Sequence, residues 1–290
     1  MSVEKEEAAA RPAPPKRTAI IGCRGRMGQM LLTRGREAGL AMSGADQPLT
    51  PEALEAALAG ADLALLCVPA AVFADVAEAV VAQLAPDAIL ADITSVKERP
   101  LRQMERLWQG AVVGTHPLFG PKAAPGADLP VAVVAGRAAR ARHLARVEGF
   151  FQTLGCRTFR CSAATHDRAM AHIQNANFIT NLAYFALLAG KEELLPFLTP
   201  SFARRKAAAA KMLTEDAELF SGLFESNAYS HEAVRQYRKM LNVAAAGDID
   251  LLCRRARWWW EEGESPRNDG DAGADGPADR REGVPPACAG

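Results

Sequence analysis

The sequence lacks an excess of charge of either sign. Lys plus Arg and Asp plus Glu both total 34, and this balance gives no support for nucleic acid or an anionic membrane as the main partner. No apolar run approaches the ~18 residues needed to span a bilayer. The acidic N-terminus also has no apolar segment like that of a secretory signal. We therefore expect no nucleic-acid partner and no membrane association.

Paired cysteines are missing as well. The six cysteines are scattered without a C-x-x-C motif, and none has a zinc-like spacing with the five histidines. Several lie in apolar runs, where a free thiol behaves as a small hydrophobic residue. These features predict that the protein has no metal site and works in a reducing compartment, which we take to be the cytoplasm.

Large apolar side chains are scarce at both ends of the 290-residue chain. Residues 1–17 are rich in Ala, Pro and charge, and residues 263–290 have almost no large apolar residue. Segments of this composition cannot offset their own ordering entropy. We predict disordered tails at both ends, each too short to hold a further catalytic or regulatory domain.

Residues 18–162 alternate short apolar runs with helical patterns. The apolar runs predict buried strands at 17–22, 62–69, 88–94, 111–117 and 129–136, with helices such as 27–39 and 71–84 between them. This alternation predicts a Rossmann-type α/β domain with a mostly parallel sheet. Residues 163–262 have helical patterns alone and predict an all-α second domain.

Three consecutive tryptophans at 258–260 cannot share one face of a helix. They must pack either within the chain or against a second copy of it. A homodimer through the helical domain is therefore expected, with a hydrophobic clamp inside one chain as the alternative.

A glycine-rich stretch follows the first predicted strand and opens the first helix. "IIGCRGRMG" (20–28) has the spacing G-x-x-G-x-x-G, a variant of the dinucleotide fingerprint. Glycines there allow a tight turn and let a pyrophosphate approach the helix N-terminus. A plain glycine-rich turn is the alternative. The predicted cofactor contacts of this loop are Gly22, Arg24, Gly25, Met27 and Gly28.

One acidic residue lies in "GLAMSGADQPL" (39–49), where the second strand of a dinucleotide-binding domain should end. Asp46 lies 18 positions after Gly28, close to the ~20 typical of the acid that binds the ribose of a dinucleotide. A carboxylate suits the 2′-hydroxyl of NAD and repels the 2′-phosphate of NADP, and no arginine follows Asp46. We therefore predict NAD as the cofactor, although a simple turn residue would look the same.

Polar clusters end three later predicted strands. "CVP" (67–69), "DITSVK" (92–97) and "GTHP" (114–117) would open onto one crevice, because open α/β sheets bind ligands at the carboxyl ends of their strands. His116 is fixed before Pro117, and an imidazole suits general base catalysis near neutral pH. Gly114 would let the backbone approach a cofactor. Ser95, taken by itself, would be a helix N-cap.

In this order and spacing, "IIGCRGRMG", "CVP", "DITSVK", "GTHPLFGP" (114–121) and "HDRAMAHIQ" (166–174) resemble the prephenate dehydrogenases of tyrosine biosynthesis. The resemblance covers roughly residues 18–262. It implies a Rossmann-type domain followed by a helical domain that dimerises. It also implies the oxidative decarboxylation of prephenate to 4-hydroxyphenylpyruvate with reduction of NAD.

The resemblance further implies roles for individual residues at the crevice. His116 would be the catalytic base that accepts the proton of the substrate hydroxyl. Ser95 would bond both that hydroxyl and the histidine. Further cofactor contacts are expected from Val68, Pro69, Thr94 and Thr115.

Substrate contacts are expected from the helical domain. His166 and Asn177 are 11 residues apart, close to three helical turns, so they would share one face, although a core stripe would look alike. Many relatives have a His-Phe pair where this chain has Asn-Phe, and an arginine where spacing gives Lys211. Because lysine cannot form the bidentate contact of arginine, we expect Arg204 or Arg205 to bind the substrate carboxylate, with Lys211 in reserve.

Other activities fit parts of the same pattern. Arogenate dehydrogenase has the same chemistry on a substrate with an amino-acid side chain, and a third variant acts on a 4-amino analogue that has no hydroxyl for His116. A β-hydroxyacid dehydrogenase or imine reductase would normally place a lysine or an acid on the long helix. An NAD-sensing regulator would need a basic DNA-reading segment, which the sequence lacks.

Overall fold

The computed structural model describes residues 12–124 and 126–260. The predicted tail at 263–290 and residues 1–11 lie outside the described residues. Residues 12–16, the end of the first predicted tail, are among the described residues. The carbonyl oxygens of Pro12 and Ala13 approach Gly149, and the N–H of Lys16 donates to Asp62 (3.0 Å). This end of the first predicted tail is therefore packed against the sheet domain.

The first part of the chain forms a seven-stranded sheet in the order β2-β1-β3-β4-β5-β6-β7. All neighbouring strands are parallel except β5 and β6. This arrangement confirms the predicted Rossmann-type fold. The strands are β1 (Arg17–Ile21), β2 (Ala41–Ala45), β3 (Leu63–Leu66), β4 (Ile89–Asp92), β5 (Val112–Pro117), β6 (Pro130–Ala135) and β7 (Arg157–Arg160).

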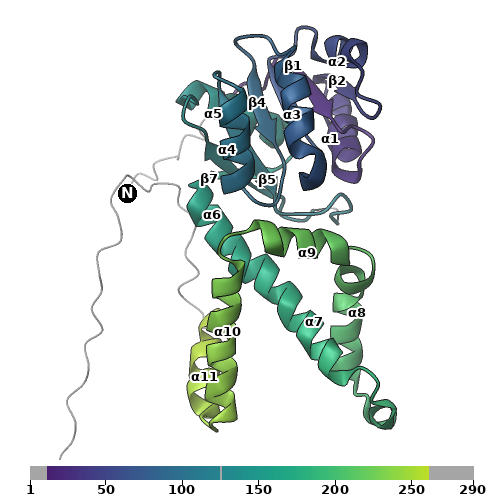
Figure 1. The fold of residues 1–290 in the computed structure, drawn as a ribbon, viewed down its shortest axis with the longest axis vertical. Coiled ribbons are helices and arrows are strands. Elements are labelled where there is room, and N and C mark those ends of the chain that lie inside the picture. The colour runs from purple at the N-terminus through teal and green to yellow at the C-terminus, as the bar shows by residue number, and fades with distance from the viewer. Residues whose placement is uncertain (1–11, 125, 261–290) are drawn as a thin grey trace, which may run out of the picture.

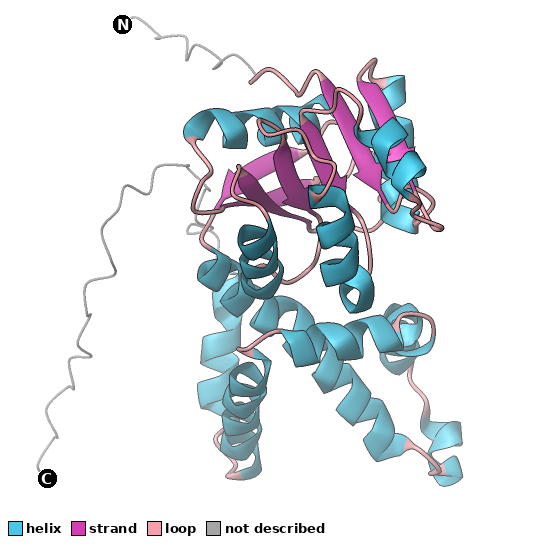
Figure 2. Cartoon of the chain, turned by 45° about the horizontal axis from the view of Figure 1, so that its top comes forward, coloured by secondary structure: helices cyan, strands magenta, loops and turns pink. Residues whose placement is uncertain are grey.

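Helices cover both faces of this sheet, as Figure 2 shows. The side chains of Ala19 and Ile21 face a core formed with α2 (Pro51–Leu58), α3 (Phe73–Val81) and α4 (Glu98–Leu107). The alternate residue Ile20 faces a second core, formed with α1 (Arg26–Glu37) and α5 (Ala141–Thr153). Alternation along a strand sends successive side chains to opposite faces, so a doubly covered sheet needs the continuous apolar runs seen in the sequence.

The second part of the chain is helical, as predicted. Helix α6 leaves the sheet domain directly after β7, and α7 extends away from it (Figure 1). None of the helices among the described residues is long and apolar enough to cross a membrane. The elements are α6 (Ala163–Met170), a π-helical turn (Ala171–Ala176), α7 (Asn177–Leu188), a 3₁₀ turn (Glu192–Phe197), α8 (Pro200–Thr214), α9 (Ala217–Ser226), α10 (Ser230–Ala245), α11 (Ile249–Arg257) and a second 3₁₀ turn (Trp258–Trp260).

Candidate active site

The glycine-rich loop joins β1 to α1 and contains two very close contacts. Gly22 has a φ of +90°, and a Cβ there would lie 2.5 Å from the carbonyl oxygen of Cys67, the residue after β3. A Cβ on Gly28 would overlap the carbonyl oxygen of Gly22. Both positions therefore require glycine, because a side chain would push α1 away from the sheet.

The N-terminus of α1 is open to an anion. Its N-cap is Gly25, which has no side chain to bond the first N–H groups. The first turn contains Arg26 and Met27 and no acidic residue. Free N–H groups and the positive end of the helix dipole both favour a phosphate. The loop thus forms a cradle that fits the pyrophosphate of a dinucleotide.

Asp46 directly follows β2 and lies beside this loop. Its carboxylate accepts the backbone N–H groups of Arg24 (2.7 Å) and Gln47 (2.8 Å). The Arg24 guanidinium donates to the carbonyl oxygen of Gln47 (3.3 Å). No arginine follows Asp46 in the sequence, but the fold brings one next to it from the loop. The end of the site expected to hold the ribose therefore has both an acidic and a basic side chain.

Three further predicted cofactor residues follow neighbouring strands. Val68 comes after β3, and its Cγ1 would lie 2.9 Å from a Cβ on Gly22. Pro69 is exposed and precedes a 3₁₀ turn. Thr94 comes after β4, where its N–H donates to Asp92 Oδ2 (2.9 Å) and its hydroxyl contacts the same carboxylate. These residues line the carboxyl edge of β3 and β4, next to the glycine-rich loop.

A fully buried lysine lies between β4 and β5. The Lys97 ammonium donates to Asp92 Oδ2 (2.6 Å) and to the carbonyl oxygen of Thr115 (2.5 Å). Thr115 is itself buried, and its hydroxyl donates to the Asp92 carbonyl oxygen (2.5 Å), so its side chain is turned away from the crevice. A Cβ on Gly114 would lie 3.2 Å from Cδ of Lys97, so this glycine makes room for the lysine. Burial lowers the pKa of Lys97, and the Asp92 carboxylate opposes that shift.

His116, in β5, is paired with a second histidine. Its Nδ1 lies 2.9 Å from Nε2 of His166, and Nδ1 of His166 lies 2.7 Å from Oδ1 of Asp167. Within the described part of the chain, Nε2 of His116 has no hydrogen-bond partner. This nitrogen is not fully buried, so it is the ring nitrogen open to a substrate. Burial, with His166 and Lys97 nearby, holds the pKa of His116 well below its usual range. The imidazole is therefore neutral at neutral pH and able to accept a proton.

The Asp167 carboxylate also caps a helix of the sheet domain. It accepts the backbone N–H groups of Lys97 (2.7 Å) and Glu98 (2.9 Å), at the start of α4. The expectation that Ser95 caps this helix is wrong, because the N-cap residue is Lys97 and the capping carboxylate comes from α6. Ser95 is half-buried in the loop between β4 and α4 and makes no side-chain hydrogen bond among the described residues.

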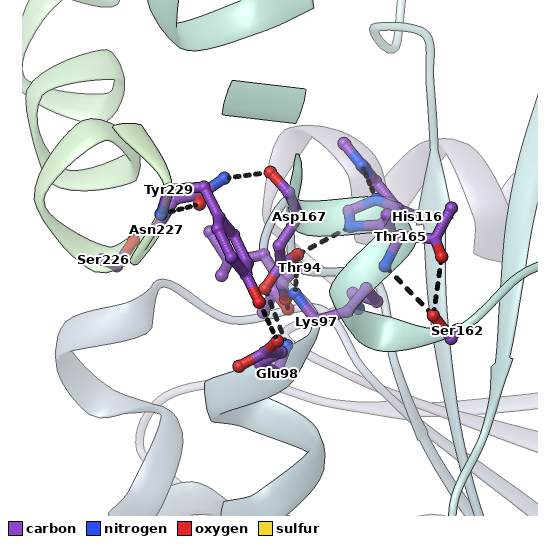
Figure 3. Close-up of polar contacts among 12 residues, drawn as sticks. Thr94, Lys97, Glu98, His116, Ser162, Thr165, Asp167, Ser226, Asn227 and Tyr229 are labelled. Atoms are coloured by element: carbon purple, nitrogen blue, oxygen red, sulfur yellow. Dashed lines mark hydrogen bonds and ion pairs between the residues drawn. The ribbon is translucent and has the colours of Figure 1, made fainter. Parts of the chain in front are cut away.

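Two more contacts hold the segment between α9 and α10, one to α6 and one to α4, and Figure 3 shows them beside His116. The Asn227 amide donates to the carbonyl oxygen of Asp167 (2.8 Å). The Tyr229 hydroxyl donates to the Glu98 carboxylate (2.8 Å). The segment between α9 and α10 is thereby fixed against both α6 and α4, and His116 lies at the junction of the two parts of the chain.

His166 and Asn177 occupy different environments. His166 is buried against His116, whereas Asn177 is exposed and accepts a hydrogen bond from the Asn181 amide (3.0 Å). The π-helical turn between them adds one residue per turn and so rotates α7 relative to α6. The single helical face predicted for the two residues therefore does not form.

Two of the basic candidates lie in the first half of α8. Arg204 donates to the Ser201 hydroxyl (2.9 Å) within the same helix. The Arg205 guanidinium lies 3.8 Å from the centre of the Tyr184 ring, a cation–π contact with α7. Neither contact connects these arginines to the residues around His116.

Lys211, near the other end of α8, is linked to the nucleotide loop. Its ammonium lies 3.0 Å from Asp216 Oδ2, and Oδ1 of the same carboxylate lies 2.9 Å from the Arg26 guanidinium. Both basic groups lower the pKa of Asp216. Lys211 is thus the member of the predicted basic set that the fold brings to the crevice side of the helical region.

Three charged residues of the site were not singled out from the sequence. Lys97 and Asp167 are inside the motifs at 92–97 and 166–174, so motif membership was an available signal, but their burial was not. Asp216 follows α8 and has no local feature that distinguishes it from a surface acid.

Comparison with known proteins agrees with this geometry. Residues 34–133 match the family model described as prephenate dehydrogenase, nucleotide-binding domain. The T-protein of Enterobacter agglomerans is 30% identical over 234 residues, which cover 78% of this chain and 61% of that protein. The chain therefore spans about three fifths of the length of this curated relative.

Solved structures show the same fold at lower identity. The arogenate dehydrogenase of Synechocystis matches with a TM-score of 0.69 and 20% identity, covering 83% of this chain and 96% of that one. A prephenate dehydrogenase from A. aeolicus, in complex with hydroxyphenyl propionate and NAD⁺, matches with a TM-score of 0.67 and 17% identity, covering 83% and 92%. The architecture of a sheet domain followed by a helical region is thus shared.

Proposed function

We propose that this chain, whose residues 34–133 match the nucleotide-binding domain of prephenate dehydrogenase and which is 30% identical to a T-protein, catalyses the oxidative decarboxylation of prephenate to 4-hydroxyphenylpyruvate in tyrosine biosynthesis. The observation that carries the proposal is the state of His116. It is a buried, neutral imidazole with one ring nitrogen bonded to His166 and the other without a partner among residues 12–124 and 126–260. A reaction that removes a hydroxyl proton while a hydride leaves needs such a base at the carboxyl edge of a dinucleotide-binding sheet.

NAD is the cofactor that fits the residues present. The cradle of Gly22, Gly25 and Gly28 leaves the N-terminus of α1 free for a pyrophosphate, and Asp46 stands where a ribose hydroxyl would bind. NAD, when bound, accepts the hydride that leaves the substrate ring. The protein's own residues hold the nucleotide and take the proton at Nε2 of His116. Loss of the ring carboxylate as CO₂ then gives an aromatic product.

The substrate carboxylate is assigned to Lys211. This lysine lies on the crevice side of α8, where the Asp216 carboxylate forms salt bridges with both Lys211 and Arg26. A dicarboxylate would compete with Asp216 for Lys211 and Arg26 through charge. Arogenate is the second candidate substrate, because the Asp216 carboxylate would attract the ammonium group that distinguishes arogenate from prephenate.

The decisive test measures NADH formation with prephenate and with arogenate, each with NAD and with NADP. Turnover of prephenate with NAD is expected, and no turnover of either substrate would exclude the proposal. His116→Asn should lower kcat by ~10²–10⁴-fold, the usual contribution of a placed base, with the affinity for NAD nearly unchanged. A change of less than about threefold in kcat would remove His116 from the role of base.

We also propose that the protein is a cytoplasmic homodimer assembled through its helical region. Every large exposed apolar side chain among the described residues lies between Ile173 and Trp260. The three tryptophans at 258–260 are 53%, 68% and 78% exposed, so a second copy is the expected partner for them. Light scattering should give twice the mass of one chain. The cysteines of the described residues are free thiols, in accord with a reducing compartment.

A further inference from the structure

We propose that Asp167 sets the tautomer of His116 through His166, and that these three residues act as one proton-accepting unit. The proposal rests on the proposed function for its chemistry, but its geometry is independent of any substrate. Asp167 is a positioning residue, because it touches neither His116 nor the open ring nitrogen. Under this proposal His166 is the hydrogen-bond partner of His116, whereas the sequence analysis expected it to contact the substrate.

The three side chains form a continuous hydrogen-bonded chain. Asp167 Oδ1 contacts Nδ1 of His166 at 2.7 Å, and Nε2 of His166 contacts Nδ1 of His116 at 2.9 Å. The two imidazole rings meet edge to face, with centroids 5.1 Å apart and planes inclined by 68°. All three side chains are at least nine-tenths buried, so water does not compete for these bonds.

The carboxylate at one end fixes where each proton lies. A carboxylate only accepts, so Nδ1 of His166 must carry the proton that it donates to Asp167. In the neutral form of His166, which the proposal requires, Nε2 has a lone pair and accepts the hydrogen bond from Nδ1–H of His116. His116 is left with its lone pair on Nε2, the ring nitrogen that is open to substrate. The other tautomer would place a proton on Nε2 of His116 and abolish its capacity as a base.

The same chain accommodates the proton that arrives during the reaction. When Nε2 of His116 takes the hydroxyl proton, the ring becomes an imidazolium whose Nδ1–H still donates to His166. Transfer of that Nδ1 proton to Nε2 of His166 places the positive charge next to the Asp167 carboxylate. One proton leaves the substrate and one is gained by the pair of rings, so the step balances without a further reactant.

Charges on every side of His116 oppose or support this protonation. On the β4–α4 segment, Lys97 opposes it and Asp92 partly offsets the lysine. On α6, a charge on His166 opposes it, whereas Asp167 supports it through His166. The Cys161 thiol, between β7 and α6, is held neutral because burial raises its pKa. Asp167 is therefore the one anion coupled to His116 through a hydrogen-bonded chain, among the residues described.

Asp167 is held rigidly enough to serve this role. Its two oxygens also accept the backbone N–H groups of Lys97 and Glu98, and its own carbonyl oxygen accepts from the Asn227 amide. A loss of activity on mutation could therefore follow from a loosened domain contact alone. The experiment must separate the tautomer from the contact.

The first readout is the nitrogen NMR spectrum of the histidine side chains, assigned with His116→Asn. In the native protein, His116 should be in the Nδ1–H form. Asp167→Asn removes the negative charge that favours a proton on Nδ1 of His166, so His116 should no longer be held in the Nδ1–H form alone and an Nε2–H population should appear. A native His116 in the Nε2–H form would overturn the proposal, and this measurement needs no substrate and no folded variant at Asp167.

The second readout is kinetic and uses matched variants. Asp167→Asn should lower kcat by ~10²–10⁴-fold with KM and the Kd for NAD within about twofold. His166→Gln retains a donor toward Asp167 and an acceptor toward His116, so it should keep kcat within about tenfold of native while shifting the acidic limb of the pH profile. Tyr229→Phe loosens the same domain contact without altering the chain and should stay near native.

Each outcome bears on one idea. If Tyr229→Phe loses as much activity as Asp167→Asn, the domain contact explains the loss and the proposal is wrong. If His166→Gln is as inactive as Asp167→Asn, the tautomer is not what Asp167 supplies. If no cyclohexadiene substrate is turned over but the NMR tautomers are as expected, the proposed function fails while the proton-accepting unit stands.

Discussion

Lys97→Met should destabilise the protein strongly, because it leaves a buried carboxylate without its counter-ion. Lys97 and Asp92 are both fully buried, and their charged atoms lie 2.6 Å apart. Among the described residues Asp92 Oδ1 has no hydrogen-bond partner, and the positive charge of Lys97 adds to the Thr94 contacts on Oδ2 in compensating the carboxylate. Breaking a buried ion pair by removing one partner typically costs ~3–5 kcal/mol. At ~2–4 °C per kcal/mol for a chain of this size, Tm should fall by about 6–20 °C.

A double variant separates the unpaired charge from the loss of packing. Lys97→Met combined with Asp92→Asn removes both charges. In the native protein the N–H of Thr94 donates to Asp92 Oδ2, and the amide oxygen of the asparagine can accept the same bond. The double variant should recover most of the lost stability, measured by urea unfolding at one protein concentration. A double variant no more stable than the single one, or a single variant within 1 kcal/mol of native, would refute the reasoning.

The double variant should also move the pH profile of the reaction. Lys97 is one of the groups that lower the pKa of His116. Its removal should raise that pKa, so the acidic limb of kcat/KM should move to higher pH. An acidic limb that stays in place would show that Lys97 acts on the fold and not on the base.

Three further predictions follow from the same geometry. Gly28→Ala should weaken NAD binding and lower Tm, because the new Cβ would overlap the Gly22 carbonyl oxygen. Gly120→Ala, which has open space around it, is the control and should leave NAD binding and Tm unchanged. Isothermal titration measures the affinity for NAD, and thermal melting measures Tm. Asp46→Asn should reduce the ratio of kcat/KM for NAD over that for NADP, and an unchanged ratio would remove Asp46 from the ribose site. The pKa of His116 is lower in the folded protein than in the unfolded chain, so between that pKa and ~6.5 the unfolded chain binds more protons than the folded protein. The free energy of unfolding should therefore rise with pH across this window. His116→Asn should flatten that rise, as measured by urea unfolding at several pH values.

The strands that could be predicted from sequence are those buried on both faces. All four residues of β3, "LALL", are buried, and a run of this kind has few alternatives to a central strand. The last strand, β7, is "RTFR", whose residues are exposed or half-buried at the sheet edge. An edge strand of this kind has no apolar run, so the hydrophobic pattern of the sequence did not predict β7. Its position depends on pairing with β6, which is a tertiary contact.

The site could be located from sequence, but the partners of its residues could not. Strand ends converge at one edge of a sheet by topology, so His116 and the glycine-rich loop were predictable together. The contacts that determine the state of His116 join residues 50 and 70 positions apart, from His116 to His166 and from Lys97 to Asp167. Local rules assigned the cap of α4 to Ser95, because a serine before a helix is the usual signal. The fold instead gives that cap to Asp167.

This choice of cap couples the geometry of the two parts of the chain to the chemistry. One carboxylate holds the N-terminus of α4 and orients His166. A motion that separates α6 from α4 would have to break the cap and move His166 from His116 in the same step. If Asp167 sets the tautomer of His116, as we propose, the accepting tautomer depends on the contact between the sheet domain and the helical region.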